Sequence, residues 1–298
     1  MRKNQLLLIF LFLFPQINLF PQVKGYIFDQ NDLTPISFVN IWVKGENIGT
    51  TSNNAGFFLI KDTLSGKSLI FSSIGYEREI LTVTDTILEV YLKPLTYSIP
   101  EVNIKPQKKA EKKIGEFKRS QLFRYSSPGG PQIFARHFDY KDEYSLTPFV
   151  SSIRIETFST KEAVFNLRLF STDSEGLPGR DILEENHLVK VKEGKKTNRI
   201  SDLESKHIVF PQEGLFIAVE YLIIEQNEFL LKFKDKNTGK RMEKIIYMPF
   251  LGTIKSDSEK NGWVYRWGKW YKDLGKHDEE MGDENIGNIL AVEITLTN

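Results

Sequence analysis

Short apolar segments alternate with polar residues along most of the chain, and they predict β-strands. Val39, Ile41 and Val43 alternate with Asn40 and Trp42, which is the period of two that a half-buried strand shows. Turn-forming sequences follow such segments, as at residues 45–49, 53–56 and 65–66. From residue 23 to residue 104 this spacing predicts a small β-sandwich.

A second block of strand-like segments occupies residues 126–298. Residues 214–221 are mostly apolar and typical of a buried central strand, and residues 290–296 close the chain with another strand. Residues 183–191 are a weak helix candidate. About eight or nine strands with frequent turns predict a larger antiparallel, jelly-roll-like β-sandwich. We therefore expect an all-β protein of two sandwiches.

A charged segment, residues 105–125, separates the two blocks. It is rich in Lys and Arg, at positions 108, 109, 112, 113, 118 and 119. Such a segment buries little apolar surface by itself, so we interpret it as a basic linker. Contact with anionic envelope lipid or polysaccharide remains the alternative.

The first 22 residues predict a signal peptide. Arg2 and Lys3 precede an apolar run of nine residues, LLLIFLFLF, which ends at Pro15. This run is too short to span a bilayer, and a basic start followed by a short apolar segment is typical of secretion. We expect cleavage after Gln22, with an uncleaved anchor as the alternative. The protein is then exported to the periplasm or the outer membrane, with no transmembrane segment after cleavage.

Several motifs of the first block occur in a specific order. They are VKGYI at residues 23–27, TPI at 34–36, VNI at 39–41, GTT at 49–51, GFF at 56–58 and LIFSSIGYE at 69–77. Together they resemble the carboxypeptidase-regulatory-like domain, a prealbumin-type seven-stranded β-sandwich. The resemblance assigns residues 23–104 to this domain and implies a protein of the Bacteroidota cell envelope. TonB-dependent receptors carry the same module, but the 194 residues after position 104 are too few for a plug and a barrel.

Composition and charge exclude several classes of protein. The chain has 40 Lys and Arg against 39 Asp and Glu, a net charge of +1, which argues against nucleic acid as a partner. Cysteine is absent, so disulfides, thiolate metal sites and cysteine nucleophiles are excluded. The fold must therefore depend on packed apolar cores.

The catalytic motifs that the sequence contains are incomplete. His277-Asp278-Glu279-Glu280 matches the first half of a carboxypeptidase zinc site, but no histidine follows to complete it. Residues 66–68 read Gly-Lys-Ser, yet a phosphate loop would need glycine at position 61, which is lysine. We expect no catalytic residue, metal or cofactor. A carboxylate pair in the second sandwich remains an open alternative, because such pairs form in space.

An aromatic group near the C-terminus is the candidate binding site. Trp263, Tyr265 and Trp267 recur at a period of two, so on a strand they would share one face, and Trp270 follows closely. Such a face either packs in a core or offers an exposed platform for sugar rings. We favour the core, because tryptophan is highly buried on average. The acidic segment 273–284 is interpreted as a solvated loop rather than a calcium site.

These features together predict an exported, non-enzymatic protein of the cell envelope. We expect it to be an accessory or binding subunit of an outer-membrane assembly, with an envelope protein complex as partner. The alternative is a carbohydrate-binding surface protein, in which a cell-surface glycan stacks on the aromatic strand face. The two hypotheses differ in whether Trp263 and its neighbours are exposed.

Overall fold

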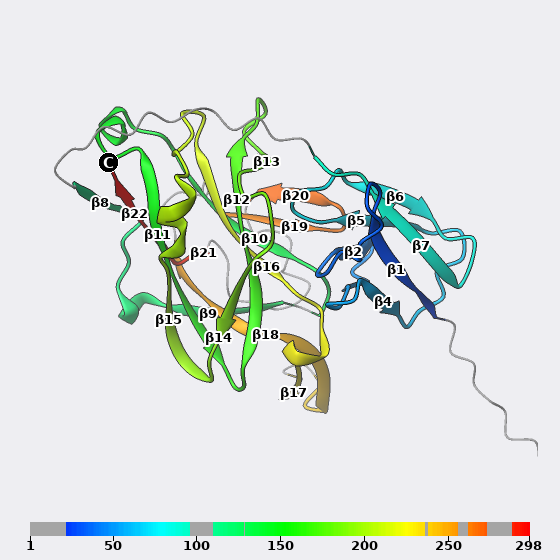
Figure 1. Ribbon diagram of the computed structural model, residues 1–298. Helices are drawn as coiled ribbons and strands as arrows, with labels where there is room; N and C mark the ends of the chain where they lie inside the picture. Colours follow the sequence, from blue (N-terminus) through cyan, green and yellow to red (C-terminus); the bar gives the residue numbers. More distant parts are fainter. Residues whose placement is uncertain (1–21, 96–109, 128, 236–237, 256–261, 273–287) are drawn as a thin grey trace, which may run out of the picture.

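The computed structural model describes residues 22–95, 110–127, 129–235, 238–255, 262–272 and 288–298, and in these ranges the protein is all-β (Figure 1). The helical segments described are short 3₁₀ turns at Arg119–Gln121, Asp142–Leu146, Asp202–Lys206 and Glu225–Asn227. Apart from Gln22, the predicted signal peptide lies outside the described residues. The expected fold class is confirmed.

The N-terminal part is a sandwich of seven strands in two sheets. Its strands are β1 (Val23–Asp29), β2 (Asn40–Val43), β3 (Gly49–Thr51), β4 (Phe57–Ile60), β5 (Ser68–Ser72), β6 (Glu79–Thr82) and β7 (Ile87–Leu92). One sheet has the order β4-β1-β7, in which β1 and β7 are parallel, and the other has the order β3-β2-β5-β6. Ile27, Ile41, Phe58, Phe71 and Val90 from both sheets form its core.

The second part is a larger sandwich of a seven-stranded and an eight-stranded sheet, more strands than the pattern predicts. The seven-stranded sheet has the order β13-β12-β16-β10-β19-β20, with β14 paired to β12. Its strands are β10 (Ile133–Phe138), β12 (Ala163–Thr172), β13 (Pro178–Asp181), β14 (His187–Val191), β16 (Leu215–Tyr221), β19 (Gly262–Arg266) and β20 (Lys269–Lys272). The helix candidate at residues 183–191 is therefore a strand in its second half.

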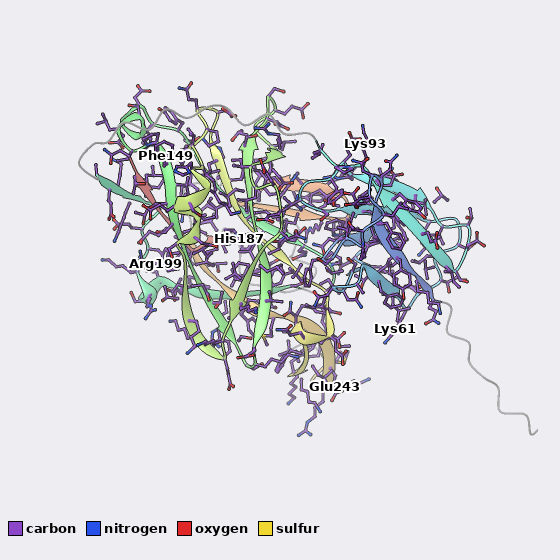
Figure 2. All side chains as sticks on the ribbon, viewed as in Figure 1. Lys61, Lys93, Phe149, His187, Arg199 and Glu243 are labelled. Atoms are coloured by element: carbon purple, nitrogen blue, oxygen red, sulfur yellow. The ribbon has the colours of Figure 1, made fainter. Side chains whose placement is uncertain are left out.

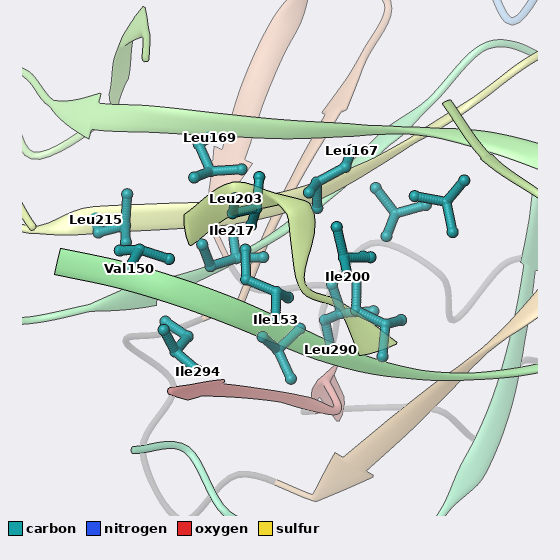
Figure 3. Close-up of a cluster of buried hydrophobic side chains, with 14 of the residues drawn as sticks. Val150, Ile153, Leu167, Leu169, Ile200, Leu203, Leu215, Ile217, Leu290 and Ile294 are labelled. Atoms are coloured by element: carbon teal, nitrogen blue, oxygen red, sulfur yellow. The ribbon is translucent and has the colours of Figure 1, made fainter. Parts of the chain in front are cut away.

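The eight-stranded sheet has the order β17-β18-β11-β22-β8, with β15 on β11 and with β9 and β21 on β18. Its strands are β8 (Glu111–Ile114), β9 (Phe123–Ser127), β11 (Phe149–Ser159), β15 (Gly194–Ile200), β17 (Glu228–Lys234), β18 (Arg241–Lys255), β21 (Asn288–Leu290) and β22 (Val292–Thr297). Figure 3 shows the core between the sheets, where Leu167 and Leu169 of β12 and Ile217 of β16 face Ile153 of β11 and Ile294 of β22.

The predicted linker is shorter than residues 105–125. Strand β8 pairs with β22 at the C-terminus, and β9 pairs with β18. The high charge of this segment does not prevent it from forming a strand. Strand pairing uses backbone groups, and the lysine side chains of β8 remain partly exposed to water. Ile114 packs against the core, and the Lys112 ammonium lies 2.8 Å from the Glu143 carboxylate. Residues 96–109 lie outside the described residues.

The two sandwiches pack face to face, so the molecule consists of four sheets in layers (Figure 1). Strand β2 illustrates the arrangement. Ile41 and Val43 point into the N-terminal core, whereas Trp42 points outward and contacts the second sandwich. In the second sandwich, Phe134 points into the core while Ala135 faces the N-terminal part. Both faces of β2 are therefore buried, not one as the alternation predicts.

Hydrogen bonds cross this interface beside the apolar contacts. The Trp42 indole donates to the carbonyl oxygen of Pro131 at 3.2 Å. The backbone N–H of Ile223 donates to the Thr51 hydroxyl at 2.8 Å, and the Asn186 side chain donates to the Ser37 carbonyl at 3.2 Å. These bonds satisfy polar groups that packing removes from water, and so they favour one relative orientation of the sandwiches.

Candidate functional site

The predicted aromatic group lies at the junction of the two sandwiches. Trp263 and Tyr265 are on β19, which pairs with β10 on one side and β20 on the other. Their side chains point the same way, as the period of two predicts, and they are 6% and 2% exposed. The strand face that would have to be open for a glycan platform is therefore covered.

The cover is supplied by the N-terminal sandwich. Trp42 and Ile70 of that sandwich join Phe216, Trp263 and Tyr265 in one buried group, which we call the interface cluster; it also contains Ile133, Ala135, Phe170 and Ala218. The Trp42 and Tyr265 rings meet edge to face at 5.3 Å, as do those of Phe216 and Trp263 at 5.9 Å. Such geometry is favourable between aromatic rings. Burial raises the pKa of Tyr265, partly offset by the positive charges of Arg78 and Arg168.

Trp267 and Trp270 occupy different positions from the first two aromatic residues. Trp267 and Gly268 form the turn between β19 and β20, with φ of 54° and 83°. The prediction that Trp267 shares the face of Trp263 is thus wrong, because the strand ends at Arg266 and the chain reverses. The Arg266 guanidinium lies 4.5 Å from the Trp267 ring centre. Trp270 is half-buried and packs edge-on against Tyr265 at 5.2 Å.

A network of charged and amide groups lies beside the interface cluster. Arg168 donates to Glu220 at 3.0 Å and to both carboxylate oxygens of Asp181. Asn166 donates to Glu220 at 2.8 Å and to Asn186 at 2.9 Å. Burial alone lowers the pKa of Arg168, but its two carboxylate partners raise that pKa above the usual value. Each charged group in this network has a partner of opposite charge, which favours a packing role.

A carboxylate pair exists in the second sandwich, on the eight-stranded sheet. Arg154 lies between Glu293, at 2.9 Å, and Glu156, at 3.9 Å, and the two carboxylate side chains are 5% and 2% exposed. The Arg119 guanidinium approaches Glu156 at 3.4 Å, and Arg154 stacks on the Phe117 ring at 4.3 Å. Both acids are buried and neutralised by arginine. This is not the accessible, water-facing geometry that glycoside hydrolysis needs.

The described histidines lie in separate places. His137 is 3.1 Å from the Thr172 hydroxyl and 3.6 Å from Asp139, while His187 is 3.4 Å from Asp202. No group of three or more metal-binding side chains occurs among the described residues. The half zinc motif at His277 and the acidic segment 273–284 lie outside that part of the chain.

An exposed aromatic surface that the sequence reasoning missed lies on the N-terminal sandwich. Tyr26 and Phe28 of β1, Phe57 of β4 and Tyr91 of β7 all point away from the core of that sandwich; we call this the aromatic face. Ring centres along it are separated by 5.3 Å for Tyr26 and Phe57, 6.2 Å for Tyr26 and Phe28, and 5.8 Å for Phe28 and Tyr91. Tyr26 is 45% exposed and Tyr91 is 44% exposed.

The aromatic face is on the sheet that the second sandwich does not cover. Figure 1 shows β1, β4 and β7 on the far side of the N-terminal sandwich from β19 and β20. Polar groups border the rings, since Tyr91 donates to the Glu89 carboxylate at 3.1 Å. The sequence does contain a sign of this aromatic face. Tyr26 and Phe28 occupy the outward positions of β1, where a half-buried strand would carry polar residues.

Comparison with known proteins gives one family and several distant structural likenesses. The family model of the CarboxypepD_reg-like domain matches residues 23–104. No curated protein matches the chain. Among the described residues, no helix is long and apolar enough to cross a membrane.

The structural likenesses are weak. The clostridial cysteine protease Cwp84 after propeptide cleavage aligns at 12% identity and a TM-score of 0.39, covering 84% of this chain, which spans about half (51%) of that one. A Bacteroides uniformis protein described as a "putative carbohydrate binding protein" aligns at 7% identity and a TM-score of 0.21, covering 76% of this chain and 98% of that one. A Bacteroides fragilis protein described as a "putative membrane-associated protein of unknown function" aligns at 12% identity and a TM-score of 0.20, covering 82% and 98%.

At these TM-scores the likenesses carry no residue correspondence, so the family match is the comparison on which identification rests. It coincides with the seven strands β1 to β7 and with the order of motifs from VKGYI to LIFSSIGYE. The strands of the N-terminal sandwich lie within residues 23–104, the segment that matches the CarboxypepD_reg-like domain family.

Proposed function

We propose that the protein is an exported, non-enzymatic component of the bacterial cell envelope that acts as an accessory or binding subunit of an outer-membrane assembly. The signal-like segment before residue 23 supports export to the periplasm or the outer membrane. The match to the CarboxypepD_reg-like domain supports an envelope location, because the resemblance to this module implies a protein of the cell envelope.

The observation that carries the proposal is the aromatic face. Tyr26 and Tyr91 are each more than two-fifths exposed, and they lie in a continuous row with Phe28 and Phe57. Exposed aromatic surfaces of this kind mark interaction sites, because tyrosine and phenylalanine supply large contact areas at interfaces. The other sheet of the domain already contacts the second sandwich, which leaves this sheet for a partner.

A binding role is favoured over catalysis by the state of the charged groups. Glu156 and Glu293 pair with Arg154, Glu156 also pairs with Arg119, and Glu220 pairs with Arg168. Catalytic acids and bases are usually found in an accessible cleft with free access to substrate. These carboxylates instead stabilise strand packing.

A glycan is the second candidate ligand, and it would bind at the aromatic face rather than at Trp263. The Tyr26 and Phe28 rings are inclined to each other by 23°, and the Phe28 and Tyr91 rings by 29°, so neighbouring rings in the row are stacked. Glu89 and the Tyr91 hydroxyl are available beside them for hydrogen bonds to sugar hydroxyls. Aromatic surfaces bordered by a few polar groups are typical of ligand sites.

Affinity capture from gently solubilised membranes tests the proposal. The bait proteins are the wild type, the double variant Tyr26→Ser with Tyr91→Ser, and the control Leu146→Ser, which removes a 74% exposed apolar side chain elsewhere. We expect the wild type and the control to retain the same envelope proteins and the double variant to lose them. A glycan array is probed with the same three proteins. If the wild type and the control bind a glycan and the double variant does not, the aromatic face is a sugar-binding site. Equal capture by all three baits contradicts a role for the aromatic face.

A further inference from the structure

A positively charged surface lies on the outer face of the eight-stranded sheet. This face points away from the N-terminal sandwich, which contacts the seven-stranded sheet. Figure 1 shows β15 at the end of the molecule opposite β1 and β7, and Figure 2 shows Arg199 at that end, on the opposite side from Lys61. We call this surface the basic face and define it by exposed cationic side chains from β15 and from residues 115–124: Arg119, Arg124, Lys195 and Arg199.

The pairing of β15 with β11 brings cations of separate strands together. Lys195 lies opposite Phe158, and Arg199 lies opposite Arg154. The guanidinium of Arg124, from β9, lies 3.9 Å from the centre of the Phe158 ring. Like charges directly opposite each other destabilise a strand pair, so an arginine at position 199 has a cost that an anion beside it would offset.

The carboxylates of β11 and β22 on this face are already bound to side chains of the protein. Glu293 lies 2.9 Å from Arg154. Glu156 lies 3.4 Å from the Arg119 guanidinium and accepts a hydrogen bond from the Thr197 hydroxyl at 2.8 Å. Both acidic side chains are buried, so a ligand that approaches this face meets the cations before it meets these acids.

The segments that carry the cations have an excess of positive charge. Residues 190–199 contain five Lys and Arg against one Glu, and residues 115–124 contain three against one, in a chain whose net charge is +1. In the described part of the chain, no carboxylate is paired with Arg124, Lys195 or Arg199. A guanidinium stacked on a ring keeps its N–H groups at the edge, where they can donate to a ligand. The basic face therefore has the donors that an anionic ligand requires.

The surroundings of these cations favour a sugar chain over a protein or a membrane. Phe117 and Phe158 are partly buried, and each lies beneath an arginine. The centres of protein interfaces are depleted of charged residues, and segments that enter a membrane interface present exposed apolar side chains. A hydrophilic polyanion needs neither feature.

We propose that the basic face binds an acidic polysaccharide, whose carboxylate groups pair with Arg124, Lys195 and Arg199. Arginine binds carboxylates through charge-assisted hydrogen bonds, as Arg154 does with Glu293 on the same face. Lys195 and Arg199 are four residues apart on one side of a strand, a separation of about 13 Å, so they contact different sugar units of an extended chain. This role is additional to binding at the aromatic face.

Isothermal titration calorimetry of the purified chain tests the proposal. The probes are polygalacturonate, in which each sugar unit carries a carboxylate, and its full methyl ester, in which the same sugar chain is uncharged. We expect binding of polygalacturonate only, weakened by added salt because exposed charge pairs are screened. The double variant Lys195→Gln with Arg199→Gln should bind about tenfold more weakly, since two exposed charge pairs are lost and each contributes up to about fivefold in affinity.

The matched control is the double variant Lys61→Gln with Arg180→Gln. It removes one exposed lysine and one exposed arginine from other surfaces, the N-terminal sandwich and strand β13, and it changes the net charge equally. We expect it to bind polygalacturonate like the wild type. The aromatic-face variant should also bind like the wild type, so this proposal and the proposed function fail separately.

Three results would overturn the proposal: no binding of polygalacturonate by the wild type, equal binding of the methyl ester, or equal affinity of the wild type and the Lys195 and Arg199 variant. Polyglutamate and vesicles of phosphatidylcholine with phosphatidylglycerol are the competing probes. Tighter binding of polyglutamate would assign the basic face to an acidic protein, and tighter binding of the vesicles would assign it to a membrane. Equal melting temperatures of the variants and the wild type verify that folding is retained.

Discussion

Two tryptophans four positions apart in the sequence have different environments in the structure. Trp263 is buried in the interface cluster, with Phe216 edge-on to its ring. Trp267 is half-buried in a turn at φ 54°, a left-handed conformation that bulky residues rarely adopt. Arg266, stacked on its ring, and Tyr271, edge-on at 5.6 Å, are the contacts that offset this backbone cost.

Substitution of the two tryptophans should therefore have unequal effects on stability. Trp263→Ala is expected to lower the free energy of unfolding by about 3–5 kcal/mol, the usual range for deleting a buried large aromatic side chain. Trp267→Gly should cost about 1 kcal/mol or less, because glycine adopts positive φ without strain and the lost contacts are partly exposed. Urea unfolding of both variants gives the comparison. Equal losses would mean that Trp267 contributes as a core residue.

A second prediction at the residue scale concerns pH and His137. Burial, the largest cause, lowers the pKa of His137 below its ordinary value of 6.5; Asp139 opposes this shift and Lys272 adds to it. The unfolded chain then binds a proton more readily than the folded protein. The contribution of neutral His137 to stability is therefore complete above about pH 6.5, and it is lost as the pH falls from there through the lower pKa of the folded protein. Urea midpoints at about pH 7.5 and pH 5.5 should differ less in His137→Gln than in the wild type. Parallel behaviour of the two proteins would contradict the assignment.

At the scale of elements, β8 shows how a charged segment joins a sheet. Its residues Glu111 and Lys113 are exposed, while its backbone pairs with the C-terminal strand β22. The Ala110 N–H donates to the side chain of Asn298 at 2.8 Å, which adds a contact at the end of this pairing. The N-terminal end of the second sandwich and the C-terminal end of the chain therefore stabilise one another.

Limited trypsin digestion should reflect this pairing. Peptide bonds after Lys112 and Lys113 are expected to resist cleavage, because a protease needs an extended, unpaired segment and these residues are in a sheet. The bond after Lys240, next to the exposed turn of the β17–β18 hairpin, should be cut earlier. Mass spectrometry of the first fragments distinguishes these sites. Early cleavage after Lys112 would show that β8 opens readily.

The local parts of this structure could be predicted from the sequence, and the long-range parts could not. Alternation at residues 39–43 and the turn residues of the first block predict strands, because side-chain direction and turn geometry depend on neighbouring residues. The same alternation could not predict that Trp42 is buried, since its contact Tyr265 belongs to the other sandwich. Burial of Trp263 and Tyr265 agrees with the favoured core position of these two side chains, but what covers them depends on the packing of two domains.

At the scale of the whole molecule, the interface cluster makes the two sandwiches mutually dependent. Trp42 is 1% exposed and is among the largest fully buried side chains of the described part, yet it belongs to neither sandwich core. The turn at Gly268 approaches the N-terminal sandwich so closely that an added Cβ would come within 2.7 Å of Ile70 Cδ1. Large apolar contacts between domains suppress relative motion, so we expect one cooperative unit.

Calorimetry of Trp42→Ala tests this dependence. The wild type should unfold in a single transition, because separation of the sandwiches exposes the interface cluster to water. Trp42→Ala removes the ring that packs on Tyr265 and the donor to the Pro131 carbonyl, at an expected cost of about 3–5 kcal/mol. Because these contacts join the two sandwiches, we expect the sandwiches of the variant to unfold in two separate transitions. Phe71→Ala is the matched control: it removes a fully buried ring from the neighbouring strand β5, on the face that points into the N-terminal core, so it should lower stability without separating the transitions. A single transition in Trp42→Ala, or two in Phe71→Ala, would contradict the assignment of Trp42 as the residue that couples the sandwiches.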